Sequence, residues 1–77
     1  MNIPIIDTVL TGKNIKKIAK EKGYSAEKLK ETLGMGDKSN IYKWFRGDIL
    51  PSIDNLLALS ILFETGINDL IITEKAV

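Results

Sequence analysis

The chain has 77 residues, of which 44% are hydrophobic and 27% charged, and it contains no cysteine and no histidine. This length supports one domain with one modest core. The missing thiol and imidazole groups exclude disulfides, thiolate nucleophiles, the usual zinc ligands and most acid–base catalysis. We therefore expect a single domain over residues 1–77 that is not an enzyme, with no metal, no other cofactor and no small-molecule substrate.

The net charge of +1 conceals an uneven distribution along the chain. Residues 1–46 hold ten of the eleven Lys and Arg residues and five of the ten acids, a balance of +5. Residues 47–77 hold one lysine and five acids, a balance of −4. A basic surface that meets a partner is therefore expected in the first two thirds of the chain.

No segment predicts membrane insertion or export. The longest nearly apolar run, residues 53–63, is interrupted by three polar residues, and it is far shorter than the roughly 20 residues of a membrane span. The first ten residues have no basic region before their apolar residues, so they do not resemble a signal peptide. A cytoplasmic protein without a membrane partner is expected.

Helix signals begin after an extended start. Residues 1–10, with "IPII", predict an N-terminal arm that Pro4 confines to a sheet edge, either packed on its own bundle or crossing to a second copy. A first helix is predicted from Gly12 to Lys22, with Thr11 as its N-cap and Gly23 as its stop. Its outer face carries four lysines: Lys13, Lys16, Lys17 and Lys20.

Four more helices are predicted after short connections. They run over residues 25–34 with Ser25 as N-cap, from near Asp37 to Gly47, from Ser52 to about Glu64, and over "INDLII" after Gly66. The five helices make residues 12–72 a compact all-α bundle.

The second and third helices are joined by "GMG", a turn with the conformational freedom that a helix-turn-helix needs. On the third helix, Ile41 and Trp44 share one side at 3.6-residue periodicity. The other side is polar and cationic, and no acid occurs between Asp37 and Asp48. Such side chains can donate to base edges or phosphate oxygens in a major groove. A solvated helix face has the same composition, so the pattern alone leaves both interpretations open.

The order and spacing of these segments resemble the Cro- and phage-repressor-like helix-turn-helix regulators, the XRE family. The stretches that carry the resemblance are "NIKKIAKEKGYS", "EKLKETLG", "NIYKWFRG", "LPSIDNLLALSILF" and "INDLI", which together span residues 12–72. The resemblance implies that residues 37–46 form a recognition helix that binds double-stranded DNA, and that the protein regulates transcription, as a repressor.

The resemblance also assigns roles to residues. It implies that Ile41 and Trp44 are the core positions of the recognition helix. Base edges are expected to be read by Lys38, Ser39 and Lys43, and the DNA backbone to be contacted by Asn40, Tyr42 and Arg46. On the first helix, Lys13 and Lys17 are candidates for flanking phosphate contacts, although a lysine-rich face can also be solvated surface.

Four positions depart from the family pattern. The turn "GMGDKS" is one residue longer than the common form. Ala26 stands where a phosphate-binding glutamine is frequent, and Lys30 stands where a small residue usually lets the two helices approach. Phe45 replaces a usually polar residue, and the sequence leaves open whether it covers the core or meets a partner.

The fourth helix is more apolar than one buried stripe requires. A patch of Ala58, Ile61, Ile71 and Ile72 would serve a homodimer on a two-fold operator with half-sites about 34 Å apart, or these residues complete a filled core. The alternative function is a protein-interaction module on the same fold, such as an antitoxin or anti-repressor component.

Overall fold

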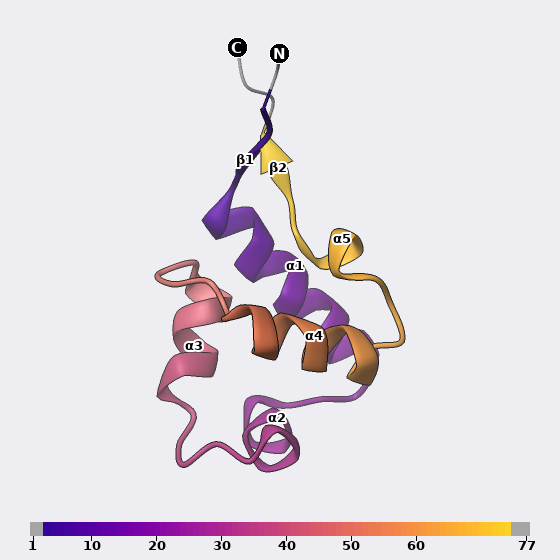
Figure 1. Ribbon diagram of the computed structural model, residues 1–77. Helices are drawn as coiled ribbons and strands as arrows, with labels where there is room; N and C mark the ends of the chain where they lie inside the picture. The colour runs from indigo at the N-terminus through magenta and orange to yellow at the C-terminus, as the bar shows by residue number, and fades with distance from the viewer. Residues whose placement is uncertain (1–2, 75–77) are drawn as a thin grey trace.

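The computed structural model describes residues 3–74, which form five helices and a two-stranded sheet (Figure 1). The helices are α1 (Thr8–Glu21), α2 (Ala26–Leu33), α3 (Ser39–Arg46), α4 (Ile53–Leu62) and α5 (Ile67–Leu70). The strands β1 (Ile5–Ile6) and β2 (Thr73–Glu74) pair antiparallel, with Ile5 opposite Glu74. The predicted all-α architecture is confirmed, and the small sheet joins the two ends of the described chain.

One hydrophobic core lies where the five helices meet, and every helix contributes to it or borders it. Its buried side chains are Ile15, Ala19, Leu29, Ile41, Trp44, Leu59, Phe63 and Leu70. Within residues 3–74, no helix has both the length and the apolar character needed to cross a membrane.

The predicted N-cap Ser25 is confirmed, and Ser52, the predicted start of the fourth helix, is the N-cap of α4. The Ser25 hydroxyl accepts the N–H of Lys28 at 3.1 Å, and the Ser52 hydroxyl accepts the N–H of Asn55 at 3.3 Å. Each bond satisfies a backbone donor that the first helical turn leaves without a partner. These local bonds explain why the starts of α2 and α4 can be read from short stretches of sequence.

The predicted start of the first helix is wrong, because α1 begins at Thr8 and Thr11 is not its N-cap. Asp7 takes that role, and its carboxylate accepts the N–H of Leu10 at 2.9 Å. Thr11 is instead fully buried, and its hydroxyl accepts the N–H of Ile72 at 3.0 Å and donates to the Ile72 carbonyl at 3.3 Å. Residues 8–10 of the expected arm are therefore helical, and residues 1 and 2 lie outside the described residues.

A second side chain of α1 helps to hold the C-terminal segment against the bundle. The Asn14 amide donates to the carbonyls of Asp69 and Leu70, at 2.8 and 3.0 Å. These carbonyls are at the end of α5, where no further helical turn supplies donors. Together with the Thr11 bonds, this contact positions β2 beside β1, so the "IPII" segment pairs with its own chain.

Candidate nucleic-acid interface

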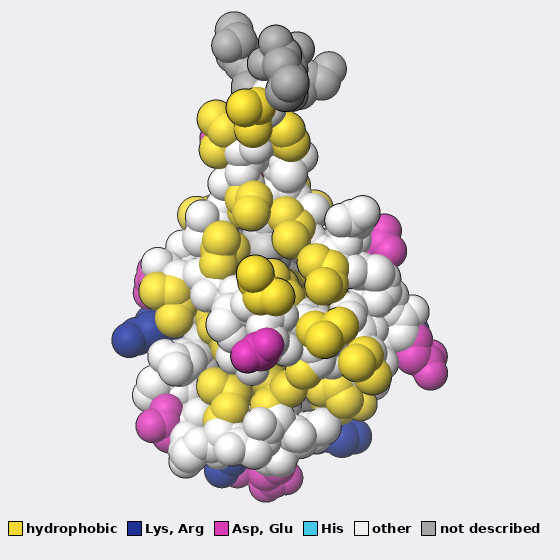
Figure 2. All heavy atoms as spheres, viewed as in Figure 1, with side chains coloured by type: hydrophobic (Ala, Val, Ile, Leu, Met, Phe, Trp, Pro, Cys, Tyr) yellow, Lys and Arg dark blue, Asp and Glu magenta, His cyan; other side chains and the backbone are white. Residues whose placement is uncertain are grey.

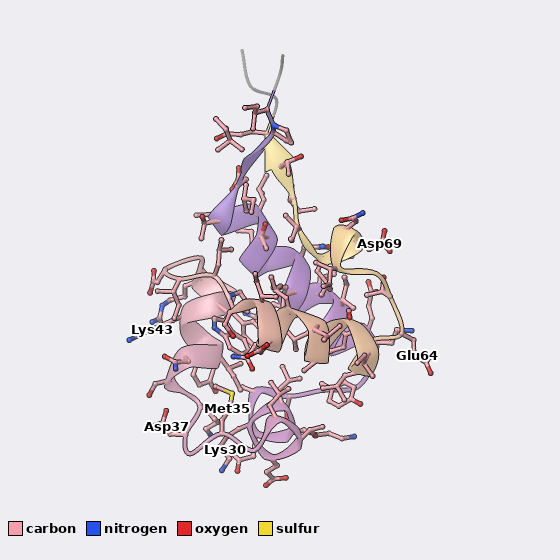
Figure 3. All side chains as sticks on the ribbon, viewed as in Figure 1. Lys30, Met35, Asp37, Lys43, Glu64 and Asp69 are labelled. Atoms are coloured by element: carbon pink, nitrogen blue, oxygen red, sulfur yellow. The ribbon has the colours of Figure 1, made fainter. Side chains whose placement is uncertain are left out.

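The turn between α2 and α3 is pinned at two points. Gly34 ends α2 in the left-handed region at φ +69°, where a side chain would be strained. Met35 then packs against the hydrophobic core, and Figure 3 shows its side chain between the two helices. The apolar side chain of Met35 thus anchors the lengthened turn to the core.

Helix α3 begins later than predicted, at Ser39 and not near Asp37. Asp37 still holds the start of the helix, because its carboxylate accepts the N–H of Ser39 at 2.8 Å. This backbone hydrogen bond lowers the pKa of Asp37.

The two faces of α3 have opposite character. Ile41 and Trp44 are 0% and 2% exposed and belong to the core. The outward residues are all exposed and polar or cationic: Ser39, Asn40, Tyr42, Lys43 and Arg46. In Figure 3 the Lys43 side chain points away from the bundle. Lys43 has no ion pair within residues 3–74, so its charge is available to a partner.

Phe45 lies at the border between these faces. It is half-buried and packs against the core. Its ring also meets the ring of Tyr42 edge-on, with centroids 6.4 Å apart. Such edge-to-face pairs are favourable. Phe45 therefore covers the border of the core and packs against the ring of Tyr42.

Three of the predicted DNA contacts, Lys38, Arg46 and Lys17, are paired with acids of the same chain. The Lys38 ammonium lies 3.3 Å from a carboxylate oxygen of Glu27, and Lys30 lies 3.0 Å from the other oxygen. The hydrogen bonds from Lys30 and Lys38 lower the pKa of Glu27, and Glu27 raises the pKa of Lys30. Lys30 thus takes part in an ion-pair network that spans the turn.

At the other end of α3, the Arg46 guanidinium Nε lies 2.9 Å from a carboxylate oxygen of Asp48. Both side chains are exposed, so a phosphate can compete for the arginine at modest cost.

Helix α3 is positioned by a close approach between α1 and α3 that the sequence did not predict. Gly12 is buried inside α1, and a Cβ atom there would overlap the Trp44 carbonyl oxygen. The same atom would lie 3.0 Å from the Gly47 nitrogen and from the Phe45 carbonyl oxygen. Only glycine allows the backbone of α1 to touch the C-terminus of α3.

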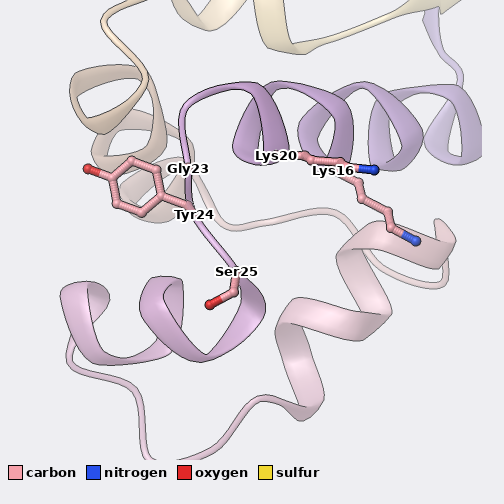
Figure 4. A pocket seen from close by; sticks show the side chains of 5 residues that line it. All are labelled: Lys16, Lys20, Gly23, Tyr24 and Ser25. Carbon is pink, nitrogen blue, oxygen red and sulfur yellow. The ribbon is translucent and has the colours of Figure 1, made fainter.

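The lysines of α1 differ in their surroundings. Lys13 is exposed, and Lys17 lies 4.0 Å from Glu21 one turn along. Lys16 and Lys20, which the sequence placed on the lysine-rich face but did not predict as DNA contacts, border an open depression of about 340 Å³ beside the start of α2 (Figure 4). Gly23, Tyr24 and Ser25 line the rest of it. A spacing of four residues places Lys16 and Lys20 on one side of the helix, but Lys13 and Lys17 have the same spacing, so this signal did not separate the two pairs.

The side of α4 that faces away from the core is apolar. Ile53, Leu57 and Ile61 are 80%, 52% and 67% exposed, and their spacing of four residues places them in one row. Figure 2 shows apolar side chains continuing over this region and toward the strands. Of the residues predicted for a dimer patch, Ile61 belongs to this row, while Ala58, Ile71 and Ile72 are only partly exposed.

This architecture, with a second helix, a pinned turn and a third helix with a polar outer face, defines a helix-turn-helix protein. A family model described as helix-turn-helix matches residues 15–70, and the chain belongs to this family. The predicted resemblance to XRE-type regulators is thereby confirmed.

Among solved structures, the chain is similar to the restriction-modification controller protein C.AhdI from Aeromonas hydrophila. The two are 28% identical, the match covers 83% of this chain and 96% of that one, and the TM-score is 0.73. A comparison with curated proteins returned no match. The family and fold are those of DNA-binding regulators of transcription.

Proposed function

We propose that this protein binds double-stranded DNA sequence-specifically, with α3 in the major groove, and represses transcription by occupying an operator in the cytoplasm. The exposed face of α3 carries this proposal, because it is polar or cationic along its whole length and lies opposite two fully packed core residues. A regulatory role also agrees with the similar controller protein, whose name describes control of a restriction-modification system.

Lys43 and Ser39 are the proposed base-reading residues, because both are exposed near the middle and start of α3. Lys38 joins them if it exchanges Glu27 for DNA, an exchange that is inexpensive for exposed ion pairs. The proposed backbone contacts of α3 are Asn40, Tyr42 and Arg46. Contacts to bases discriminate between sequences, whereas contacts to phosphate add affinity for any sequence.

The test is a titration of a fluorescent duplex that carries the preferred site, followed by anisotropy. Lys43→Gln should weaken binding by about 1–3 kcal/mol if Lys43 reads a base, and Lys43→Glu should abolish it through repulsion. Lys22→Glu is the matched control, since Lys22 directly follows α1 and carries the same charge. Equal binding by wild type and Lys43→Glu would refute the proposed role of α3.

The row of Ile53, Leu57 and Ile61 is the proposed homodimer surface. A two-fold operator matches a two-fold protein dimer, and an isologous contact requires one self-complementary patch. A row along one helix can meet its own copy in antiparallel orientation. Leu57→Lys should therefore shift sedimentation from dimer to monomer, whereas sedimentation of the wild type as a monomer on and off DNA would refute this interface.

The same apolar face favours one alternative, a protein-interaction module such as an antitoxin or anti-repressor component. Its distinguishing result is a stoichiometric protein partner recovered from the native host, together with no retention on DNA at low salt.

A further inference from the structure

We propose that Lys16 and Lys20 of α1 hold the phosphates of the DNA strand beside the recognition helix, and that Lys17 contributes little. The inference rests on the proposed function, since it assumes that α3 binds in the major groove. It assigns the flanking contact to a different pair of α1 lysines from Lys13 and Lys17, the pair expected from the sequence.

The first argument is the direction of these side chains around α1. Gly12 marks the side of α1 that touches α3. At 3.6 residues per turn, Lys16 and Lys20 are rotated from Gly12 by about 40° and 80°, whereas Lys17 is rotated by about 140°. In Figure 4, Lys16 and Lys20 lie next to each other on α1, and one of the two side chains reaches toward α3. Both lysines therefore lie toward the side of α1 that contacts α3.

The second argument is the shape of the surface between these elements. Lys16 and Lys20 border the open depression that reaches Ser25, the N-cap of α2. The Tyr24 ring points away from both lysines (Figure 4) and packs on Phe63, with ring centroids 5.7 Å apart. Tyr24, which lines the depression, is thus fixed against the core, and the two flexible lysine side chains border the same depression.

The third argument is electrostatic. Within residues 3–74, neither Lys16 nor Lys20 has an acidic group within ion-pair distance, while Lys17, Lys38 and Arg46 each have one. A lysine that is already paired must give up its acid before it neutralises a phosphate. An unpaired lysine releases a condensed counterion from DNA at no such cost. Lys16 and Lys20 should therefore contribute more strongly to the salt dependence of binding.

The experiment compares two double variants that remove the same charge from the same region. Lys16→Gln/Lys20→Gln is measured against Lys17→Gln/Lys22→Gln, with a specific and a scrambled duplex, by anisotropy across a series of salt concentrations. All four lysines are exposed, and glutamine has a helix propensity close to that of lysine. Circular dichroism and thermal melting check that both variants remain folded.

We expect the first variant to lose about 1.8 from the slope of log K against log salt, at about 0.9 per phosphate contact. At 0.1 M salt this corresponds to a loss of up to roughly 60-fold in affinity, equal for both duplexes. The control should keep nearly the wild-type slope. The same slope change in both variants, or none in the first, would overturn the inference while the proposed function stands. A wild-type protein that binds neither duplex would overturn both.

Discussion

Replacement of Gly12 by alanine should destabilise the protein, although alanine is the better helix former. In the interior of a helix, Gly→Ala normally stabilises by about 0.8–1 kcal/mol. Here the added Cβ atom meets three backbone atoms: the Trp44 and Phe45 carbonyl oxygens and the Gly47 nitrogen. Backbone atoms cannot rotate aside as a side chain can, so α1 and α3 must separate.

The size of the effect follows from these opposing contributions. Overpacking of a tight contact costs about 1–3 kcal/mol and occasionally more, and the backbone obstacle places this site at the upper end. After subtraction of the helix-propensity gain, we expect a net loss of about 2 kcal/mol. For a domain of this size the melting temperature should fall by roughly 8–16 °C, at about 4–8 °C per kcal/mol.

Thermal unfolding followed by circular dichroism measures this loss. Gly36→Ala is the matched control, because Gly36 lies in the turn before α3, has no positive φ, and a Cβ there meets nothing within 4 Å. The control should melt at or slightly above the wild-type temperature. If Gly12→Ala melts as high as the control, the close approach of α1 and α3 is not what positions α3.

Two further predictions concern polar contacts. Thr11→Val should lower the free energy of unfolding by about 1–3 kcal/mol in urea titrations, because the Ile72 N–H loses its buried acceptor; unchanged stability would show that this bond does not anchor the C-terminal segment. Ion pairing lowers the pKa of Glu27, so its stabilising effect is complete above its ordinary pKa and is lost as the pH falls through the lowered pKa. Glu27→Gln should therefore reduce the loss of stability on acidification, and an acid unfolding curve identical to that of the wild type would contradict this.

The helices could be predicted where their ends depend on local chemistry. Ser25 and Ser52 cap the helices that they immediately precede, and the spacing of Ile41 and Trp44 matches the buried side of α3. These features depend on residues within one or two helical turns, which is the range over which a periodic pattern carries information.

Features that join distant parts of the chain could not be predicted in the same way. The sequence predicts Thr11 as a helix N-cap, but its hydroxyl binds a backbone group 61 positions away. The role of Gly12 depends on how α1 crosses α3, and the pairing of Lys38 with Glu27 depends on the path of a lengthened turn. Tertiary packing decides these contacts, so they appear only once the elements are assembled.

The most direct measurement for the central claim is selection of bound duplexes from a random double-stranded pool by the full chain, with Lys43→Glu as a parallel selection. The wild type should enrich one shared motif, arranged as an inverted repeat if the protein binds as a dimer, and Lys43→Glu should not enrich it. Recovery of no common sequence by the wild type, or of the same motif by both proteins, would contradict sequence-specific recognition by α3.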